Sequence, residues 1–270
     1  MRRTFLFVFI FIIAVSSYSD LVCAQAFPDL EKQSDIAASD KKSQKNDAVS
    51  EDDFELDSID VELETTFVRD PIEPYNRAIH TFNDKFYFYA VKPMTTGYNK
   101  VIPEKAQLCV RNFFSNIKMP IRLFNCLFQG KFKGAGTEGM RFLINSTIGG
   151  IGFTDPAKKY FKLELQDEDF GQTLGHYKMG NGIFIEWPFI GPSSVRDTIG
   201  FLGDMALNPL TIASYAVTPF VTTGAGVYNE FNEVALEKGE TYETIVEPAI
   251  DPYIAVQDSY IQNRTKKIRE

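Results

Sequence analysis

The spacing of apolar residues limits most strongly how this chain can fold. Large apolar side chains recur every three or four positions at Tyr75, Ile79, Phe82, Phe86 and Tyr89. This interval places them on one face of an α-helix, and Pro74 suits the first turn of that helix. Residues 86–89 are aromatic throughout, so the helix is apolar all the way round at this point. Such a helix lies either in a core or at a lipid boundary.

A second helical pattern covers residues 103–130 and is interrupted by Pro120. Because proline cannot donate a backbone hydrogen bond, we expect two helices that meet at an angle and form a hairpin, which ends at Gly130. A soluble core and a bilayer interface are both suitable environments for such a hairpin. Periodicity alone favours the core, because most amphipathic helices are packed in this way.

Glycine and proline divide the second half of the chain. The three glycines within residues 148–153 predict a turn. Alternating apolar residues within 177–189 predict a short β-hairpin whose turn lies at Gly180–Gly182. After Pro192 the apolar spacing becomes helical again.

The stretch from residue 205 to residue 228 contains no charged residue, but Pro209 and Pro219 interrupt it. These interruptions argue against a standard transmembrane helix. A surface half immersed in lipid and a packed interior both fit this composition, and the sequence does not distinguish them.

The N-terminus predicts export. Arg2 and Arg3 precede an unbroken apolar run from Phe5 to Val15. As a helix this run would extend about 16 Å, which is too short for a hydrocarbon core of roughly 30 Å. We therefore expect residues 1–26 to be a secretory signal peptide.

Two processing routes remain open at the end of this signal. Cys23 is the candidate lipid anchor, although Asp20 and Val22 match a lipobox poorly. Ala24–Ala26 offers an A-x-A site with cleavage before Phe27.

The charge of the chain is unevenly distributed. Its net charge is −8, and residues 27–66 alone carry −9 from thirteen acidic residues and four lysines. This segment has few large apolar groups, so it is predicted to be a disordered acidic tether. Residues 67–270 are neutral overall and long enough to form a single domain.

Few sequence features indicate catalysis or cofactor binding. A neutral domain lacks the basic surface that nucleic acids require. His80 and His176 have no partner at metal-ligand spacing, so neither a metal nor another cofactor is expected. Residues 134–139 match G-x-G-x-x-G, but no alternation of strand and helix surrounds them. They are predicted to form a turn between helices, and the chain is not expected to be an enzyme.

Cys109 and Cys126 lie on the two arms of the predicted helical hairpin. In an oxidising compartment they form a candidate disulfide. Two free buried thiols are the alternative, because sequence spacing does not show whether the arms align.

Many short blocks of residues 70–264 resemble the MlaA/VacJ lipoproteins. In chain order these blocks are Asp70–Arg77, Phe82–Asn83, Lys92–Pro93, Asn112–Asn116, Asn125, Gln129–Gly130, Arg141–Thr147, Phe153–Ala157, Phe170–Gly175, Pro188–Ser194, Arg196–Asp197 and Asp251–Tyr253. The blocks occur in unbroken order, which makes coincidence a poor explanation.

The resemblance implies a mainly α fold, with a single ring-like helical domain in the membrane interface and at most a short β-hairpin. It implies a protein on the periplasmic face of a Gram-negative outer membrane, which removes mislocalised phospholipids from the outer leaflet. The implied partners are phospholipid, an outer-membrane porin trimer and a periplasmic lipid carrier. A structural porin-associated protein and a soluble periplasmic lipid-binding protein are the alternatives.

The resemblance also supplies candidate site residues. Arg141, Asp155, Arg196 and Asp197 are candidates for polar groups on a lipid path, since arginine can hold a phosphate through two hydrogen bonds. Helix capping and ion pairs between helices are the alternative roles for these four residues. Phe82 and Asn83 match the F-N dipeptide of the family and are candidates for setting the resting state of a channel.

Overall fold

The computed structural model describes residues 70–238 and 240–270. The predicted signal peptide (1–26), acidic tether (27–66) and lipid anchor (Cys23) lie outside the described residues.

The described chain is mainly helical. Its helices are α3 (Glu73–Phe86), the π-helix η1 (Tyr87–Val91), α4 (Lys92–Val101), α5 (Glu104–Ile117), α6 (Met119–Phe128), α7 (Phe132–Thr147), α8 (Pro156–Phe161), α9 (Phe170–His176), α10 (Val195–Leu207), α11 (Pro209–Ala213), α12 (Pro219–Leu236), α13 (Glu240–Val246) and α14 (Pro252–Arg269). Its strands are β1 (Phe184–Trp187) and β2 (Gly191–Ser194).

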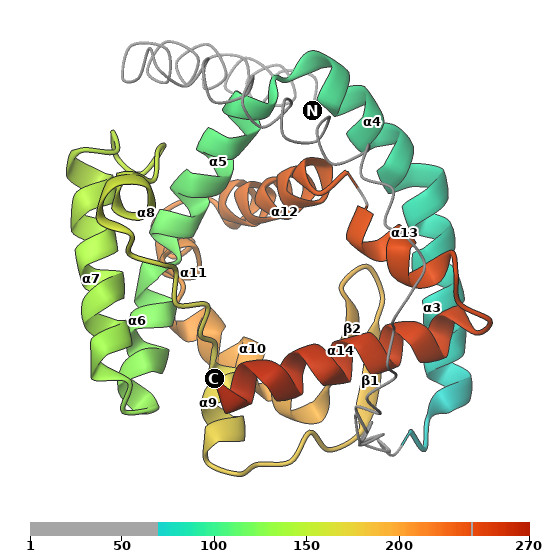
Figure 1. The fold of residues 1–270 in the computed structure, drawn as a ribbon. Helices are drawn as coiled ribbons and strands as arrows, with labels where there is room; N and C mark the ends of the chain where they lie inside the picture. Colours follow the sequence, from blue (N-terminus) through green and yellow to red (C-terminus); the bar gives the residue numbers. More distant parts are fainter. Residues whose placement is uncertain (1–69, 239) are drawn as a thin grey trace, which may run out of the picture.

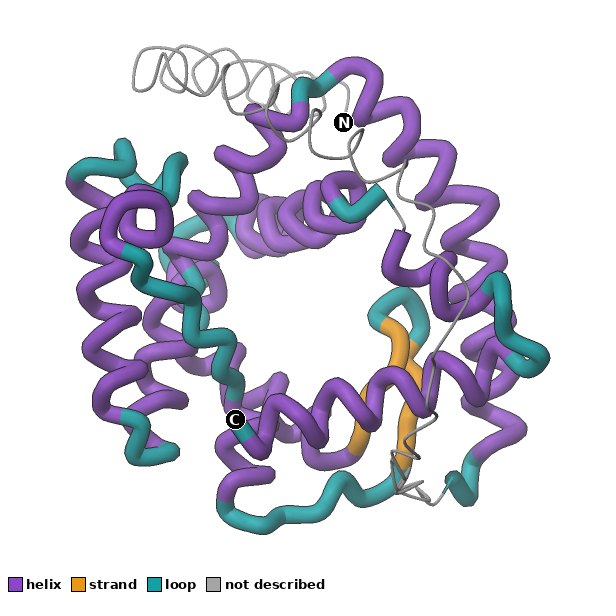
Figure 2. The backbone as a smooth tube through the Cα atoms, in the orientation of Figure 1, coloured by secondary structure: helices purple, strands orange, loops and turns teal. Residues whose placement is uncertain are grey.

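These elements form a ring. In Figures 1 and 2 the helices surround a central space between the ribbons, with α3 and α4 on one side, α6 and α7 on the other, and α14 across the lower edge. The C-terminal end of α14 packs against α9, and α12 packs against both α4 and α5. The predicted single, ring-like helical domain is confirmed.

Proline starts many of these helices. Among the described residues, seven helices carry a proline in the first turn, where a missing N–H breaks no hydrogen bond within the helix. Pro120 lies in the first turn of α6, directly after α5 ends at Ile117. The predicted break at Pro120 is confirmed, as are the helix end at Gly130 and the turn at 148–153.

The predicted hairpin of the two arms around Pro120 is wrong. The extensive packing of α6 is against α7, which is the next helix along the chain. Gly134 lies in this contact, where a β-carbon would come 3.1 Å from the thiol of Cys126. The predicted turn at 134–139 is also wrong, because these residues belong to α7. Their glycines allow close helix packing and do not end the helix.

A β-hairpin is present, but its turn is not at Gly180–Gly182. The register pairs Trp187 with Gly191 and Phe184 with Ser194, so the chain reverses at residues 188–190. Phe189 and Gly191 adopt positive φ values of 66° and 95° there. The glycine-rich segment instead pairs with the start of α10, where the backbone N–H of Arg196 donates to the carbonyl of Asn181 (3.2 Å).

The uncharged stretch 205–228 folds into the end of α10, α11 and the start of α12. Pro209 and Pro219 each begin a helix, which confirms the interruptions predicted from the sequence. In the described part of the chain, no helix combines the length and apolarity needed to cross a membrane.

The interior of the ring wall is unusually polar. Among the described residues, nineteen polar or charged side chains are buried, against fourteen hydrophobic ones. Many large hydrophobic side chains are exposed instead, including Tyr89 (83%) and Phe220 (69%). Polar contacts therefore join many of the helices, whereas apolar groups cover much of the surface.

Candidate functional site

In this protein many polar side chains are buried and many apolar ones are exposed, an arrangement that we call inverted polarity. Helix α3 shows it most clearly. Its Asn76 and His80 are buried, whereas Phe82 and Phe86 on the other side are 42% and 39% exposed. A water-soluble helix normally buries its apolar face. The helical spacing was therefore predicted correctly, but the face that packs against the protein is the polar one.

The buried polar face of α3 holds the edge of β1. Asn76 Nδ2 donates to the carbonyl of Phe184 (3.0 Å), and the N–H of Glu186 donates to Asn76 Oδ1 (2.9 Å). One side-chain amide thus takes the place of a neighbouring strand and satisfies two groups on an otherwise open edge. Four residues further along, His80 Nδ1 lies 3.2 Å from the buried Glu186 carboxylate.

Asn83 fixes the turn of the hairpin. Its Nδ2 donates to Glu186 Oε1 (3.2 Å) and to the Trp187 carbonyl (3.0 Å). Its Oδ1 accepts from the backbone N–H of Phe189 (2.8 Å). The predicted residue Asn83 therefore connects α3 to the segment that joins the two strands.

Phe82 contacts the same turn through its ring. The rings of Phe82 and Phe189 meet edge to face with centroids 5.0 Å apart, and Phe86 meets Phe189 similarly at 4.9 Å. Such aromatic pairs contribute about 0.5–1.5 kcal/mol beyond the burial of their area. Both members of the predicted F-N dipeptide thus contact Phe189, Phe82 through its ring and Asn83 through the backbone N–H, in a chain reversal more than 100 residues away in sequence.

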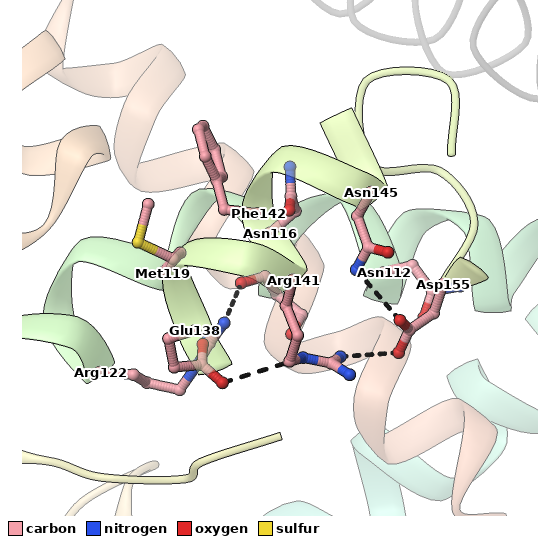
Figure 3. A pocket seen from close by; sticks show the side chains of 10 residues that line it. Asn112, Asn116, Met119, Arg122, Glu138, Arg141, Phe142, Asn145 and Asp155 are labelled. Atoms are coloured by element: carbon pink, nitrogen blue, oxygen red, sulfur yellow. Dashed lines mark hydrogen bonds and ion pairs between the residues drawn. The ribbon is translucent and has the colours of Figure 1, made fainter. Parts of the chain in front are cut away.

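Arg141 and Asp155 form a partly buried ion pair between α7 and the start of α8 (Figure 3). Arg141 Nη2 donates to Asp155 (2.7 Å), and Asn145 Nδ2 donates to the other oxygen of the same carboxylate (3.1 Å). Asp155 also caps α8 by accepting from the N–H of Lys158 (3.0 Å). Both residues are predicted site residues, and the structure brings them together.

Glu138 lies one turn before Arg141 on α7, belongs to the same cluster and is fully buried. Arg122 Nε donates to it at 2.7 Å, and Arg141 Nε lies 3.8 Å from its other oxygen. The backbone N–H of Gln166 donates to it as well (2.9 Å). These partners neutralise and solvate a charge that would otherwise be costly to bury.

Arg196 and Asp197 belong to a second cluster, which joins α9, α10 and α14. Arg264 on α14 donates to both oxygens of Asp197 (2.8 and 2.9 Å) and to both oxygens of Asp169 (2.6 and 2.9 Å). Arg196 Nε donates to Asp197 (2.9 Å). Burial alone would raise the pKa of Asp197, but hydrogen bonds from Arg264 and Arg196 outweigh burial and lower it.

The two clusters are separate in the structure. Arg141 and Asp155 lie between α7 and α8, whereas Arg196 and Asp197 lie where α10 meets α9 and α14. Within the described residues, their charges form the ion pairs and caps that were the alternative role. The suggested place on a lipid path is not tested by these contacts and stays a prediction.

Asp204 on α10 is a half-buried carboxylate at the junction with α6 and α9. It accepts from the N–H of Phe170 (3.1 Å) and from Asn125 Nδ2 (2.9 Å). Burial raises its pKa to about 6, and the nearby Asp169 adds to this shift. The folded state therefore binds a proton that the unfolded state releases near pH 4.

This shift predicts a loss of stability with rising pH. As the pH increases from about 4 to about 7, the free energy of unfolding should fall by about 1 kcal/mol more in the wild type than in Asp204→Asn, after allowance for solvent screening. Chemical denaturation of the purified mature proteins at both pH values measures this difference. Equal pH dependence of the two proteins would contradict the assignment to Asp204.

The candidate disulfide between Cys109 and Cys126 is not formed. Cys126 is a free, fully buried thiol on α6. Its thiol faces Gly134 of α7, because α6 packs on α7 and does not fold back along α5. Burial raises the pKa of the Cys126 thiol to about 11, and the carboxylates of Glu168 and Glu138 add to this shift.

Several residues of these clusters were missed from the sequence, namely Arg122, Glu138, Asp169, Glu186 and Arg264. The available signal was a charge inside an otherwise apolar run, as at Arg122 between Ile121 and Leu123. A charge in that position needs a buried partner, but the sequence does not say which one.

Fold and site together define a helical ring whose polar groups join its helices and whose apolar groups lie outside. Comparison with known proteins agrees with this class. The family model of the MlaA lipoprotein matches residues 68–267. The chain belongs to the MlaA lipoprotein family.

In these comparisons the matched region spans most of this chain and most of each relative. The "Intermembrane phospholipid transport system lipoprotein MlaA" of Shigella flexneri is 29% identical over 198 residues, which cover 72% of this chain and 76% of that protein. An uncharacterized protein of Rickettsia bellii is 28% identical over 204 residues, covering 75% and 78% of the two chains.

A solved structure has the same fold. It is described as "Structural basis for maintenance of bacterial outer membrane lipid asymmetry", and it superposes with a TM-score of 0.65 at 28% identity. The match covers 74% of this chain and 99% of the other. The ring is therefore the fold that this chain shares with that structure.

Proposed function

We propose that this protein removes mislocalised phospholipids from the outer leaflet of a Gram-negative outer membrane and passes them inward to the periplasm. This activity would maintain the lipid asymmetry of the outer membrane. The observation that carries the proposal is the inverted polarity of the ring, in a chain whose relatives are named for phospholipid transport.

Inverted polarity suits a protein surrounded by acyl chains. Exposed apolar side chains cost free energy in water, at about 25 cal/mol per Å² of apolar surface, and this cost disappears in lipid. In lipid, helices gain little from hydrophobic contact with each other, so polar contacts contribute more to joining them. The exposed apolar residues of α10, α11 and α12 fit a ring that lies in the membrane interface.

The proposed partners follow from the same activity. A porin trimer would hold the ring at the periplasmic face of the outer membrane, and a soluble periplasmic carrier would receive the lipid. Transfer through a ring breaks no covalent bond, so it requires neither catalytic residue nor cofactor. Arg141, Asp155, Arg196 and Asp197 are proposed to hold the shape of the wall around the lipid path.

A deletion strain tests this function. Phospholipid in the outer leaflet should rise in the deletion strain and return to normal with the wild-type gene, as read by an acyltransferase or phospholipase that acts only on the outer leaflet. No change, with the protein expressed and membrane-bound in the parent strain, would exclude removal of outer-leaflet lipid. A structural role beside a porin would then be the better explanation. Extraction without detergent would instead favour a soluble lipid-binding protein.

Phe82 and Asn83 are proposed to set the resting state of the lipid path, because both hold the hairpin turn on α3. Asn83→Ala removes three hydrogen bonds of about 1 kcal/mol each, and Phe82→Ala removes an aromatic contact. Both changes should alter outer-membrane permeability, which is measured by entry of a dye that the intact membrane excludes.

Thr81→Ala is the matched control for these changes. Among the described residues, the Thr81 hydroxyl bonds only to the carbonyl of Arg77 within the same helix, so its loss leaves the hairpin contacts intact. Permeability that stays at the wild-type value in both Phe82→Ala and Asn83→Ala would refute this role.

A further inference from the structure

A charged side chain occupies the buried face of strand β1. Successive side chains of a strand point to opposite faces, so Phe184 and Glu186 share the face of β1 that lies against α3. They are 1% and 2% exposed, whereas Trp187 on the other face is 36% exposed. An apolar residue is the usual occupant of such a position, because an ionised carboxylate is costly to bury. The position of Glu186 therefore indicates a role beyond packing.

The carboxylate of Glu186 is directed at helix α3. Its Oε1 lies 3.2 Å from Nδ1 of His80 and accepts from Nδ2 of Asn83, also at 3.2 Å. These two residues are three positions apart, so they lie on one face of the helix. Among the described residues, no lysine or arginine forms an ion pair with Glu186, and its second oxygen, Oε2, is buried without a hydrogen-bond partner. Its contact with α3 is thus carried by a single shared oxygen.

The hairpin of β1 and β2 depends on contacts from outside itself. Its strands have four residues each, and Glu186 is paired with Pro192, which has no N–H to donate to the ladder. A two-stranded hairpin of this kind is marginally stable alone. In Figure 1 the hairpin lies between α3 and the central space between the ribbons. Contacts from α3 are therefore needed to hold its turn in one conformation.

Asn83 connects Glu186 to that turn. A side-chain amide has one donor end and one acceptor end. The donor end, Nδ2, is bound by Glu186 and by the Trp187 carbonyl (3.0 Å), so that Oδ1 accepts from the backbone N–H of Phe189 (2.8 Å). An ionised carboxylate can only accept hydrogen bonds, so Glu186 favours this orientation of the amide over the flipped one.

We infer that Glu186 is a positioning residue of the lipid path: its carboxylate orients the Asn83 amide, which in turn holds the turn at 188–190 on α3. His80 holds the same oxygen from the preceding turn of the helix, and its ring meets that of Tyr253 edge to face at 5.8 Å. The inference rests on the proposed function, because it identifies what supports the proposed role of Asn83.

The tryptophan of the hairpin reports its position in the purified protein. Trp187 is the only tryptophan of the chain, and its indole N–H donates to Thr198 at 3.1 Å. Quenching of its fluorescence by acrylamide, in the mature protein held in mild detergent, measures its exposure to solvent. We expect Glu186→Leu to raise the opened fraction of the hairpin, and with it the quenching, about 5-fold, the effect of one lost hydrogen bond on an equilibrium.

The conservative variant Glu186→Gln separates positioning from packing. Its amide oxygen still accepts from α3, and its amide nitrogen takes the place of Oε2, which has no partner among the described residues. Quenching in Glu186→Gln should therefore stay within about 2-fold of the wild type, since the shared hydrogen-bond acceptor is kept. The matched control is Ile185→Val, on the other face of the same strand, which should be quenched like the wild type.

Dye entry into cells shows whether Glu186 acts through Asn83. Glu186→Leu should change outer-membrane permeability in the same direction as Asn83→Ala. Added to Asn83→Ala, it should have little further effect, because the residue through which it acts is already gone. A residue that only stabilised the strand would add its own effect to that of Asn83→Ala. Immunoblots check that the variants are present in equal amounts.

Three results would overturn the inference. They are wild-type quenching in Glu186→Leu, equal quenching in Glu186→Gln and Glu186→Leu, and additive effects of Glu186→Leu and Asn83→Ala on dye entry. The first two are measured on the purified protein without the deletion strain, so failure of this inference is distinguishable from failure of the proposed function. Circular dichroism checks that each variant keeps its fold. Where Glu186→Leu does not, Glu186→Asp, which withdraws the carboxylate from α3 by one methylene, takes its place with the same expectations.

Discussion

Glu138→Ala is expected to lower the free energy of unfolding by about 3–5 kcal/mol, the usual cost of removing one partner from a buried ion pair. Glu138 is fully buried, and its carboxylate accepts from Arg122 at 2.7 Å with Arg141 at 3.8 Å. Without it, both arginines keep their charge in the interior, and Asp155 alone remains to neutralise them. The backbone N–H of Gln166 also loses its acceptor.

Thermal and chemical unfolding of the purified mature protein in mild detergent measures this change. Glu138→Gln keeps the size of the side chain and an acceptor, so it should fall between alanine and the wild type. The control is Glu230→Ala, which breaks an exposed ion pair with Lys118 (3.1 Å) and should cost about 1 kcal/mol or less. Equal losses in Glu138→Ala and Glu230→Ala would mean that the buried cluster does not stabilise the ring.

Local sequence signals were sufficient to predict some of the helices. Apolar spacing located α3, α5, α6 and α10, and Pro120 located the start of α6, whereas Pro209 and Pro219 were predicted only as interruptions and begin α11 and α12. These signals are reliable because they act within one turn: proline cannot donate to the preceding turn, and apolar spacing reflects a single face. The closed ring followed from the family resemblance and not from periodicity, since no local signal encodes how distant helices meet.

Predictions failed where tertiary contacts determine the role of a residue. Glycines at 134–139 and 180–182 have the composition of turns, yet Gly134 makes room for the Cys126 thiol, and a β-carbon at Gly182 would come 3.1 Å from the Val195 side chain. The actual reversal at 188–190 contains one proline and two apolar residues. The choice between a Cys109–Cys126 disulfide and free thiols stayed open in the sequence for the same reason, because helix order along the chain does not show that α6 packs on α7.

The candidate site was predicted in part. Arg141 and Asp155 are only 14 residues apart, and both were selected. Arg196 and Asp197 were also selected, but Arg264, which holds Asp197 from 67 residues away, was not. Phe82 and Asn83 were chosen by resemblance, and their common contact, Phe189, became visible only in the structure. The sequence was sufficient to select individual charged residues. Their partners far away in the chain could not be predicted, because those contacts form only when the ring closes.

Arg264→Met is expected to destabilise the protein by about 3 kcal/mol, near the lower end for a broken buried ion pair because the Asp169 side chain is 34% exposed. Arg264 makes two hydrogen bonds to each of Asp169 and Asp197. Methionine therefore removes the cation that the two carboxylates share, and Asp197 keeps an ion pair with Arg196 (2.9 Å). Because α14 reaches α9 and α10 through this residue, the loss should weaken closure of the ring.

The pH dependence of this effect follows from the two carboxylates. In the wild type, burial alone would raise the pKa of Asp169, but the hydrogen bonds from Arg264 lower it to about 2. The stability that this lowered pKa provides is present above about pH 4 and is lost as the pH falls through 2. In Arg264→Met the largest opposition to burial is lost, so the pKa of both carboxylates rises. Protonation of these carboxylates in acid then removes part of the cost of burying their charges.

The stability difference between wild type and Arg264→Met should therefore be largest near neutral pH and should narrow as the pH falls below about 4. Chemical denaturation in mild detergent over this range measures the difference. Lys267→Met, on the same helix, removes an ion pair with the exposed Asp167 and should cost about 1 kcal/mol or less at every pH. A difference that does not vary with pH would show that Arg264 acts through packing of its side chain and not through its charge.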